Sequence, residues 1–191
     1  ALSVSDVVGL VIGTRPDCMP DALLDYLAQL HREKFVLVEY GVESTCDVTL
    51  ERINRGHTYQ CAVKTIQRTA ERGLPVGAHF ILGLPGETRE FTVQQAEIIN
   101  QLPIDTLKLH QLQIIRGTAM AREFVQQRER ASQDASFVSD YYLYTAEEYA
   151  SLIVDFLEKL RPDLVVERFT SSSPQALLLA PEWGLKNYEF V

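Results

Sequence analysis

Apolar runs recur along the chain, and each is followed by a polar loop and then by a segment with helical spacing. The runs have the length of buried strands and cover residues 7–12, 35–38, 76–82, 106–115 and 164–169. Apolar residues three or four positions apart predict amphipathic helices over residues 20–30, 49–54, 59–72, 90–102, 119–130 and 145–160. This alternation predicts an α/β protein with a parallel sheet and right-handed crossover connections.

The third apolar run leads into the turn Gly83-Leu-Pro-Gly86 and then into a helix that starts near Thr88. A strand, a glycine-rich turn and a helix start can bring free backbone N–H groups close to a ligand. Many turns of this kind only connect a strand to a helix. Both interpretations stay open when this segment is taken alone.

Several local features can also be predicted. Gly73 is placed to close the helix over residues 59–72, and Thr145 with Glu148 has the sequence pattern of a capping box. Residues 131–140 are small, polar and aperiodic, which predicts a surface loop. The tail, residues 177–191, carries Trp183 and is too apolar to be free in solvent, so we expect it to pack on the domain.

The loops that follow the five strands are richer in Gly, Arg, Glu, Thr and Ser than the strands themselves. In a parallel sheet these loops meet at the carboxyl ends of the strands, where α/β proteins place their sites. We therefore expect a ligand site at this rim. The loops are Gly13-Thr-Arg-Pro-Asp17, Glu39-Tyr-Gly-Val-Glu-Ser44, Gly83-Leu-Pro-Gly-Glu-Thr88, Ile114-Ile-Arg-Gly-Thr118 and Arg168-Phe-Thr-Ser-Ser-Ser-Pro174.

The composition is that of a soluble globular domain with an acidic balance. Of the 191 residues, 46% are hydrophobic and 23% are charged, and the formal net charge is −8. No basic cluster stands out, so bulk electrostatics offers little to a nucleic acid. No apolar run is long enough to span a bilayer and the N-terminus lacks a signal-peptide pattern, so we expect no membrane partner and a cytoplasmic location.

The cysteine and histidine spacings predict no metal site within the chain. Cys18, Cys46 and Cys61 are odd in number and far apart, which fits reduced thiols better than a disulfide framework or a C-x-x-C site. The four histidines form no H-x-x-x-H or H-E-x-x-H pair.

Four ordered motifs, G-T-R-P-D, Y-G-V-E-S, N-R-G-H and I-L-G-L-P-G-E-T, resemble the radical S-adenosylmethionine superfamily, in particular its Elongator-like branch of bacterial iron–sulfur oxidoreductases. The likeness runs from about Val7 to the tail. It implies a partial TIM-type (β/α) barrel that binds S-adenosylmethionine and a [4Fe-4S] cluster, with reductive cleavage to a 5′-deoxyadenosyl radical. It also implies an electron donor for the cluster and a substrate, a small molecule or an RNA, that the sequence does not identify.

The resemblance assigns roles to residues of the matched motifs. Ile81 and Gly83 fall where relatives pack the adenine against strand backbone and an apolar side chain. Glu43, next to Ser44, stands where relatives usually have a glutamine that bonds the ribose, and a carboxylate can accept the same hydroxyls. Arg55 stands where relatives bind the methionyl carboxylate with an arginine. The further cofactor-binding candidates are Ser44, Thr14, Arg15, His79 and Gln111, and Lys108 and His110 are candidates to line the barrel.

The chain departs from the family pattern in two ways. Elongator-type relatives have Glu before T-R-P, where this chain has Gly13. The cluster motif C-x-x-x-C-x-x-C and the G-G-E segment that holds the methionyl amine do not occur. We therefore expect residues 1–191 to be the C-terminal part of a longer barrel, without its first two βα units and with residues 164–191 as last strand and packed tail. The chain alone is then not catalytic, and its first strand is covered by residues 1–6 or pairs in a homodimer.

Each candidate residue also has a purely structural interpretation. Arg15 can pair with Asp17 or Asp21, and the Asn54-Arg-Gly-His57 run can be a helix cap. Glu43 can cap the following helix, and His79 can be a satisfied core histidine. Lys108 and His110 share one side of a strand, which faces either the barrel interior or the helices. The cluster Tyr141, Tyr142 and Tyr144 either packs the last long helix or offers a substrate platform.

Two other functional classes stay open. One is a cluster-free α/β barrel enzyme that binds a phosphorylated metabolite through the Gly83–Thr88 turn and the Arg116-Gly-Thr118 loop. The other is a non-catalytic nucleotide- or RNA-binding module that uses the rim, for which salt-dependent tRNA binding is the distinguishing observation.

Overall fold

A computed structural model describes residues 4–184 and 187–190 of the chain. Its centre is a five-stranded sheet in the order β1-β2-β3-β4-β6, in which every neighbouring pair is parallel. The sheet consists of β1 (Gly9–Thr14), β2 (Phe35–Glu43), β3 (Val76–Leu82), β4 (Thr106–Gln111) and β6 (Val165–Arg168). The predicted α/β fold is therefore confirmed, and five parallel strands in sequential order form part of a TIM-type barrel.

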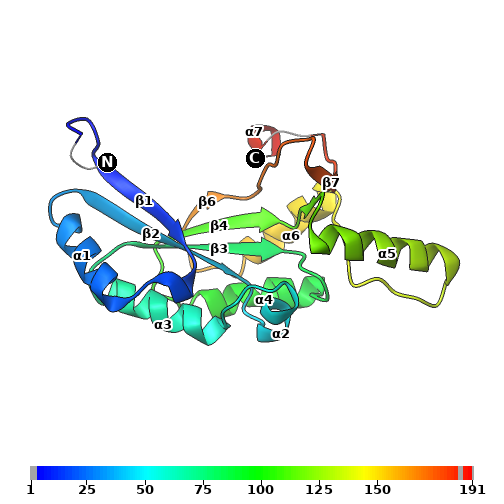
Figure 1. Ribbon diagram of the computed structural model, residues 1–191, viewed down its shortest axis with the longest axis horizontal. Helices are drawn as coiled ribbons and strands as arrows, with labels where there is room; N and C mark the ends of the chain where they lie inside the picture. Colours follow the sequence, from blue (N-terminus) through cyan, green and yellow to red (C-terminus); the bar gives the residue numbers. More distant parts are fainter. Residues whose placement is uncertain (1–3, 185–186, 191) are drawn as a thin grey trace.

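The main helices cover one side of this sheet, and Figure 1 shows α1, α3 and α4 along that side with α5 extending away from it. Every predicted helix is present, with ends shifted by at most three residues. The helices are α1 (Asp21–His31), α2 (Asp47–Arg52), α3 (Tyr59–Ala70), α4 (Arg89–Ile99), α5 (Ala119–Gln133), α6 (Ala146–Leu157) and α7 (Asn187–Phe190), and the 3-10 helix η1 (Pro16–Cys18) precedes α1. Among the described residues, no helix has the length and apolar character to cross a membrane.

The core lies between the sheet and these helices and takes alternate residues from each strand. Side chains alternate between the two faces of a strand, so the residues between the core positions lie on the opposite face. On β4 these are Thr106, Lys108 and His110, which settles the question that the sequence left open: they face away from the helices. The core positions, each at most 1% exposed, include Val38, Tyr40, Ala78, Phe80, Leu107 and Leu109.

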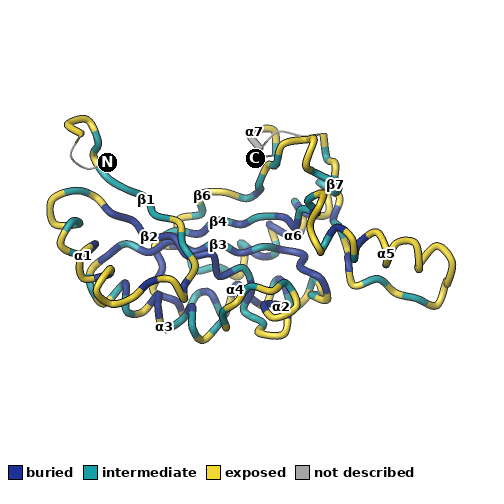
Figure 2. The backbone as a smooth tube through the Cα atoms, in the orientation of Figure 1, coloured by how far each residue is buried: buried dark blue, intermediate teal, exposed yellow. Residues whose placement is uncertain are grey.

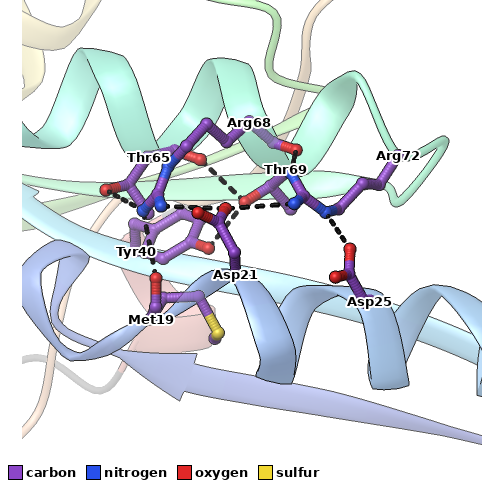
Figure 3. A network of polar contacts seen from close by, with 8 residues as sticks. All are labelled: Met19, Asp21, Asp25, Tyr40, Thr65, Arg68, Thr69 and Arg72. Atoms are coloured by element: carbon purple, nitrogen blue, oxygen red, sulfur yellow. Dashed lines mark hydrogen bonds and ion pairs between the residues drawn. The ribbon is translucent and has the colours of Figure 1, made fainter.

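A polar network ties α3 to α1 (Figure 3). Arg72 donates from Nε to Asp25 at 2.7 Å and from Nη2 to Asp21 at 3.0 Å. Arg68 donates to the same Asp21 carboxylate and to the Met19 carbonyl, both at 3.0 Å. Because Asp21 is shared by two arginines one helical turn apart, the first turn of α1 is fixed against the last turn of α3.

Two strand predictions were wrong. The second strand does not end at Val38 but continues to Glu43, because Glu39 and Gly41 occupy the face away from the helices, where neither disturbs the core. The fourth strand, predicted over residues 106–115, ends at Gln111. Residues Ile114–Ile115 (β5) pair instead with Leu178–Ala180 (β7) in a separate antiparallel sheet. The first strand is shifted by two residues toward Thr14.

Several local predictions are confirmed. Gly73 has the positive φ of 73° that a closing glycine supplies, and both hydrogen bonds of the Thr145–Glu148 capping box are present. Trp183 packs on Tyr149, with ring centroids 5.3 Å apart, so the tail does contact the domain. The predicted loop over residues 131–140 starts later, after α5 ends at Gln133, and is largely exposed (Figure 2). The predicted cover of β1 by residues 1–6 falls partly on residues 1–3, which lie outside the described residues.

Candidate functional site

Glu43 and Arg55 meet at the carboxyl end of β2. Glu43 ends the strand with a φ of 73°, a conformation that non-glycine residues rarely adopt. Arg55, just after α2, donates from Nη2 to the Gly41 carbonyl at 2.7 Å and lies 3.1 Å from Glu43 Oε1. A Cβ on Gly41 would collide with both side chains, 2.5 Å from Glu43 Oε1. Glycine at this position therefore lets the ion pair lie across the strand, and two predicted cofactor residues are brought together.

The Glu43 carboxyl group is largely shielded from solvent. Burial raises its pKa to about 7, and the opposing effect of the Arg55 guanidinium is smaller. Near neutral pH this group exists in both protonation states. It can thus accept hydrogen bonds as a carboxylate or donate one as an acid.

Arg15 and Thr14 lie at the same rim, at the end of β1. Arg15 forms an ion pair with Asp17, including Nε to Oδ1 at 2.9 Å, so one structural interpretation of this residue is realised. A Cβ on Gly56 would lie 3.3 Å from the Arg15 guanidinium, which places Arg15 against the loop that carries Arg55. The Thr14 hydroxyl donates to the Arg15 carbonyl at 3.4 Å.

Ser44 is fully buried and connects the β2 loop to the glycine-rich turn. Its hydroxyl donates to Glu87 Oε1 at 2.5 Å and accepts the Cys46 N–H at 3.0 Å. Gln95 of α4 holds the same loop, accepting the Thr45 N–H at 2.8 Å. The Ser44 hydroxyl is thus used within the protein, and its predicted contact with a cofactor stays a prediction.

Backbone N–H groups of the turn over residues 83–88 donate hydrogen bonds to carbonyl groups of the protein itself. The Gly86 N–H donates to the Asp140 carbonyl and the Glu87 N–H to the Leu84 carbonyl, both at 3.0 Å. The Thr88 hydroxyl accepts the Phe91 N–H and caps α4. The Glu87 carboxyl group is half-buried beside these groups, and this partial burial raises its pKa. These bonds leave the turn poorly suited to a phosphate group.

Gly83 and Ile81 lie at the end of β3. Gly83 has a φ of 85°, and a Cβ there would lie 3.0 Å from the Tyr144 ring. Tyr144 belongs to the core, which supports the packing interpretation of this tyrosine and fills the space that glycine leaves. Ile81, on the face away from the helices, packs beside a second apolar cluster that includes Leu84 and Ile114.

Gln111 joins β4 to the loop after β6. Its Nε2 donates to the Ser171 carbonyl at 2.9 Å, and its Oε1 accepts the Ser171 N–H at 2.8 Å. The Gln111 side-chain amide therefore pairs with the backbone of Ser171 as a neighbouring strand would. The cofactor contact predicted for Gln111 would have to compete with these two bonds.

Three residues that contact the predicted site residues do not belong to the set that the sequence predicts: Glu39 on β2, Glu87 in the turn after β3 and Gln95 on α4. The sequence predicts a loop at Glu39, but Glu39 is a buried carboxylate on β2 that bonds Lys108 and His79. The sequence carries one indication of this placement: Glu39 is a charged residue four positions before Glu43, so the two lie on the same face of one strand. Glu87 and Gln95 looked like ordinary residues of a helix start and a helix, and their role depends on contacts with a distant loop.

The side chains at the rim can be compared with the cofactors that the sequence resemblance implies. A guanidinium beside a carboxylate suits a ligand that carries both a carboxylate and hydroxyl groups, as S-adenosylmethionine does. A [4Fe-4S] cluster does not fit: over residues 4–184 and 187–190, no three His, Cys, Asp or Glu side chains are grouped to hold a metal ion. Cys18, Cys46 and Cys61 are free thiols at separate places.

Two protein-family models match the chain in succession. Residues 3–93 match the family described as Radical SAM superfamily, and residues 104–191 match the Radical SAM C-terminal domain.

Curated relatives and solved structures agree with these matches. Protein YhcC of Escherichia coli K12 is 36% identical over 96% of this chain and 56% of its own length, and YtqA of Bacillus subtilis is 33% identical over 98% and 55%. The chain thus spans about half the length of these curated relatives. Elp3 of Methanocaldococcus infernus, solved with an N-terminal deletion, is similar in fold with a TM-score of 0.74 at 22% identity, over 90% of this chain and 38% of that one.

Proposed function

The chain belongs to the radical S-adenosylmethionine superfamily, in its Elongator-like branch, and from this membership we propose that its gene product is a radical enzyme whose S-adenosylmethionine site is partly built by the rim of this sheet. The observation that supports the proposal most directly is the Glu43–Arg55 pair at the end of β2. These two residues were assigned to the cofactor from sequence motifs, and they are adjacent in the fold.

Four residues of the rim have a role in this proposal. Arg55 binds the methionyl carboxylate through its guanidinium group, which can donate two parallel hydrogen bonds. Glu43 accepts the ribose hydroxyls, and Ile81 offers apolar surface to the adenine. Arg15, against Gly56, supports the loop that positions Arg55.

Together with a reduced [4Fe-4S] cluster, bound S-adenosylmethionine would supply the radical chemistry of hydrogen-atom abstraction. The described residues do not hold such a cluster, so no reaction step is assigned to them beyond binding and orientation. We accordingly expect the 191-residue chain to bind the cofactor's analogues without turnover. The substrate, a small molecule or an RNA, and an electron donor complete the proposed system.

Calorimetric titration with S-adenosylhomocysteine tests the site assignment on this chain. We expect measurable binding that weakens by about tenfold in Arg55→Lys, because a point-charge ammonium cannot reproduce the two bonds of a guanidinium. Glu43→Leu is expected to weaken binding similarly. The matched control is Arg52→Lys, since Arg52 is nearby but pairs with Glu123 and Asp140.

Two results would count against the proposal. One is a chain that is folded by circular dichroism but binds no S-adenosylhomocysteine. The other is binding that Arg55→Lys, Glu43→Leu and Arg52→Lys leave equally unchanged.

A further inference from the structure

The glycine-rich turn over residues 83–88 presents the Glu87 carboxyl group to the loop that carries the predicted cofactor residues. The Ser44 hydroxyl donates to Glu87 Oε1 at 2.5 Å, and the Gln95 amide donates from Nε2 to Glu87 Oε2 at 3.2 Å. The side chain of Thr49, in α2, donates a further hydrogen bond to the same carboxyl group. The loop after β2, helix α2 and helix α4 therefore meet at one carboxyl group. We call Ser44, Glu87 and Gln95 the rim network.

Gln95 completes the rim network from α4. Its side chain is 1% exposed, and its Oε1 accepts the Thr45 N–H at 2.8 Å and the Thr45 hydroxyl at 3.0 Å. Because the amide oxygen accepts from Thr45 and the amide nitrogen donates to Glu87, the two partners fix the orientation of the amide. Position 87 in turn needs a side chain that accepts hydrogen bonds at both of its terminal atoms.

The rim network is attached to an irregular end of β2. The pairing of β2 with β3 shifts register between Gly41 and Glu43, and Glu43 has a φ of 73°. Such an irregularity bends a strand and redirects its side chains, and a positive φ at a non-glycine residue persists only where the surroundings hold it. The next residue is Ser44, which is fully buried. The hydrogen bond from Ser44 to Glu87 therefore holds the backbone directly beside Glu43.

The rim network also reaches the helix that leads to Arg55. Thr49 is 5% exposed and lies within α2. The carbonyl of the following residue, Leu50, accepts the Arg55 N–H at 2.9 Å. The hydrogen bond from Thr49 to Glu87 thus holds the helix from which the Arg55 loop extends. One carboxyl group is connected to both members of the Glu43–Arg55 pair.

The Glu87 carboxyl group is held by neutral donors alone in the part of the chain that the structure describes. Partial burial raises its pKa, and the hydrogen bonds from Ser44, Thr49 and Gln95 oppose this rise. A half-buried carboxyl group without a counter-ion costs free energy, and apolar packing at such a position is often as stable or more so. This cost indicates a role in geometry rather than in stability.

We propose that Glu87 and Gln95 are positioning residues, which hold the loop between β2 and α2 in the geometry that lets its two cofactor residues act together. Their effect on cofactor binding passes through Glu43 and Arg55, without a contact of their own. The inference deepens the proposed function and rests on it for the identity of the ligand. The geometry of the Glu43–Arg55 pair can be measured without any ligand.

Exchanging donor and acceptor within the rim network tests the proposal without creating a cavity. In Glu87→Gln a side-chain NH₂ group faces the Gln95 NH₂ group, and in Gln95→Glu two carboxyl groups face each other. The double variant Glu87→Gln/Gln95→Glu again pairs one donor with one acceptor and keeps the net charge. We therefore expect each single variant to disturb the loop and the double variant to restore it.

The first readout needs no cofactor. Arg55 Nε donates to the Gly41 carbonyl at 3.3 Å, so the ¹⁵Nε resonance of Arg55, assigned with Arg55→Lys, reports the arrangement of the loop. We expect this resonance to move in each single variant and to return in the double variant. Glu90→Gln is the matched control, because it makes the same chemical change at an exposed position in the first turn of α4. It is expected to leave the resonance in place.

The second readout is calorimetric titration with S-adenosylhomocysteine. We expect binding about tenfold weaker in Glu87→Gln and within about twofold of the original in the double variant. In a Glu43→Leu background, Glu87→Gln is expected to add about twofold or less, because the two changes remove the same interaction. A purely structural role would instead lower stability in urea and leave the affinity of the folded chain unchanged. Ser44→Ala, which removes one donor to Glu87, is expected to act in the same direction and replaces Glu87→Gln if that variant does not fold.

The outcomes separate this proposal from the proposed function. The positioning role is overturned by an Arg55 resonance and an affinity that the single variants leave unchanged, or by a double variant that behaves no better than they do. An Arg55 resonance that responds as expected, in a chain that binds no S-adenosylhomocysteine, would contradict the proposed function and leave the positioning of the pair standing. Binding that responds to Arg55→Lys but to no rim-network variant would remove the positioning role alone.

Discussion

Glu43 combines an uncommon backbone conformation with a carboxyl group that is shielded from solvent. Its backbone has a positive φ, its carboxyl group is largely buried, and Arg55 supplies one nearby positive charge. Strained backbone and shifted pKa values are both common where a protein is built to bind a ligand rather than to be as stable as possible.

The shifted pKa of Glu43 predicts a direction for the stability of the fold. Its pKa rises from 4.5 to about 7 because of burial, so the folded state binds this proton more tightly than the unfolded state. The contribution of Glu43 to the free energy of unfolding is therefore fully present below pH 4.5 and is lost as the pH rises through 7. Carboxyl ¹³C resonances, assigned with Glu43→Gln, should show titration near neutral pH, and urea unfolding of Glu43→Gln should lack this loss.

The contribution of His110 to the free energy of unfolding changes with pH in the opposite direction, over a similar pH range. Comparing Glu43→Gln with the unsubstituted chain isolates the contribution of Glu43, because both proteins retain His110. Its lowered pKa gives stability above its ordinary pKa of 6.5 that is lost as the pH falls toward 4. A Glu43 carboxyl group that titrates at or below 4.5 would show that it is not shielded as described.

Individual residues were predictable from sequence where a motif fixed both their type and their place. Glu43 and Arg55 come from adjacent motifs, and the structure places them in contact. Ser44 and Gln111 also lie at the rim, but both are bonded to loops far away in sequence. Such bonds depend on the fold as a whole, so no local pattern could have indicated them.

Threonine caps set the starts of four helices. Thr58, Thr88, Thr118 and Thr145 each accept the backbone N–H three residues ahead. In α4 and α5 these caps directly follow rim loops. The start of each helix therefore also fixes where the preceding loop ends.

The capping box of α6 offers a test at this scale. Thr145→Ala removes the oxygen that accepts the Glu148 N–H and is expected to lower the free energy of unfolding by about 1 kcal/mol. Thr145→Ser keeps the oxygen and serves as the control. Urea unfolding of the two variants measures the difference, and equal stabilities would mean that the cap contributes nothing.

Whole elements were predicted well when apolar periodicity alone defined them. The helices α1 to α6 and β3 follow from spacing, because burial against one neighbour is enough to produce the pattern. The end of β2 was missed because Glu39 and Gly41 resemble loop residues, although they face the polar side of the sheet. The β5–β7 pair was missed because its strands are short and more than sixty residues apart in sequence, and periodicity carries no information on such pairing.

The molecule as a whole presents two different faces of one sheet. One is an apolar core sealed by helices and tied by the α1–α3 network of Figure 3. The other is polar, carries the ion pair between Glu39 and Lys108, and ends at the Glu43–Arg55 pair. A barrel that only needed to fold would pack both faces with apolar residues. The residues of the proposed cofactor site, Glu43 and Arg55, lie at the carboxyl rim of the polar face.

The most direct test of the proposed function is the release of 5′-deoxyadenosine from S-adenosylmethionine. The gene product that contains these residues would be reconstituted with iron and sulfide without oxygen and reduced with dithionite. We expect release that falls by about tenfold or more in Arg55→Lys, through loss of the bidentate contact, and persists in Arg52→Lys. A gene product that takes up no cluster, or that holds a cluster and releases no 5′-deoxyadenosine, would contradict the account.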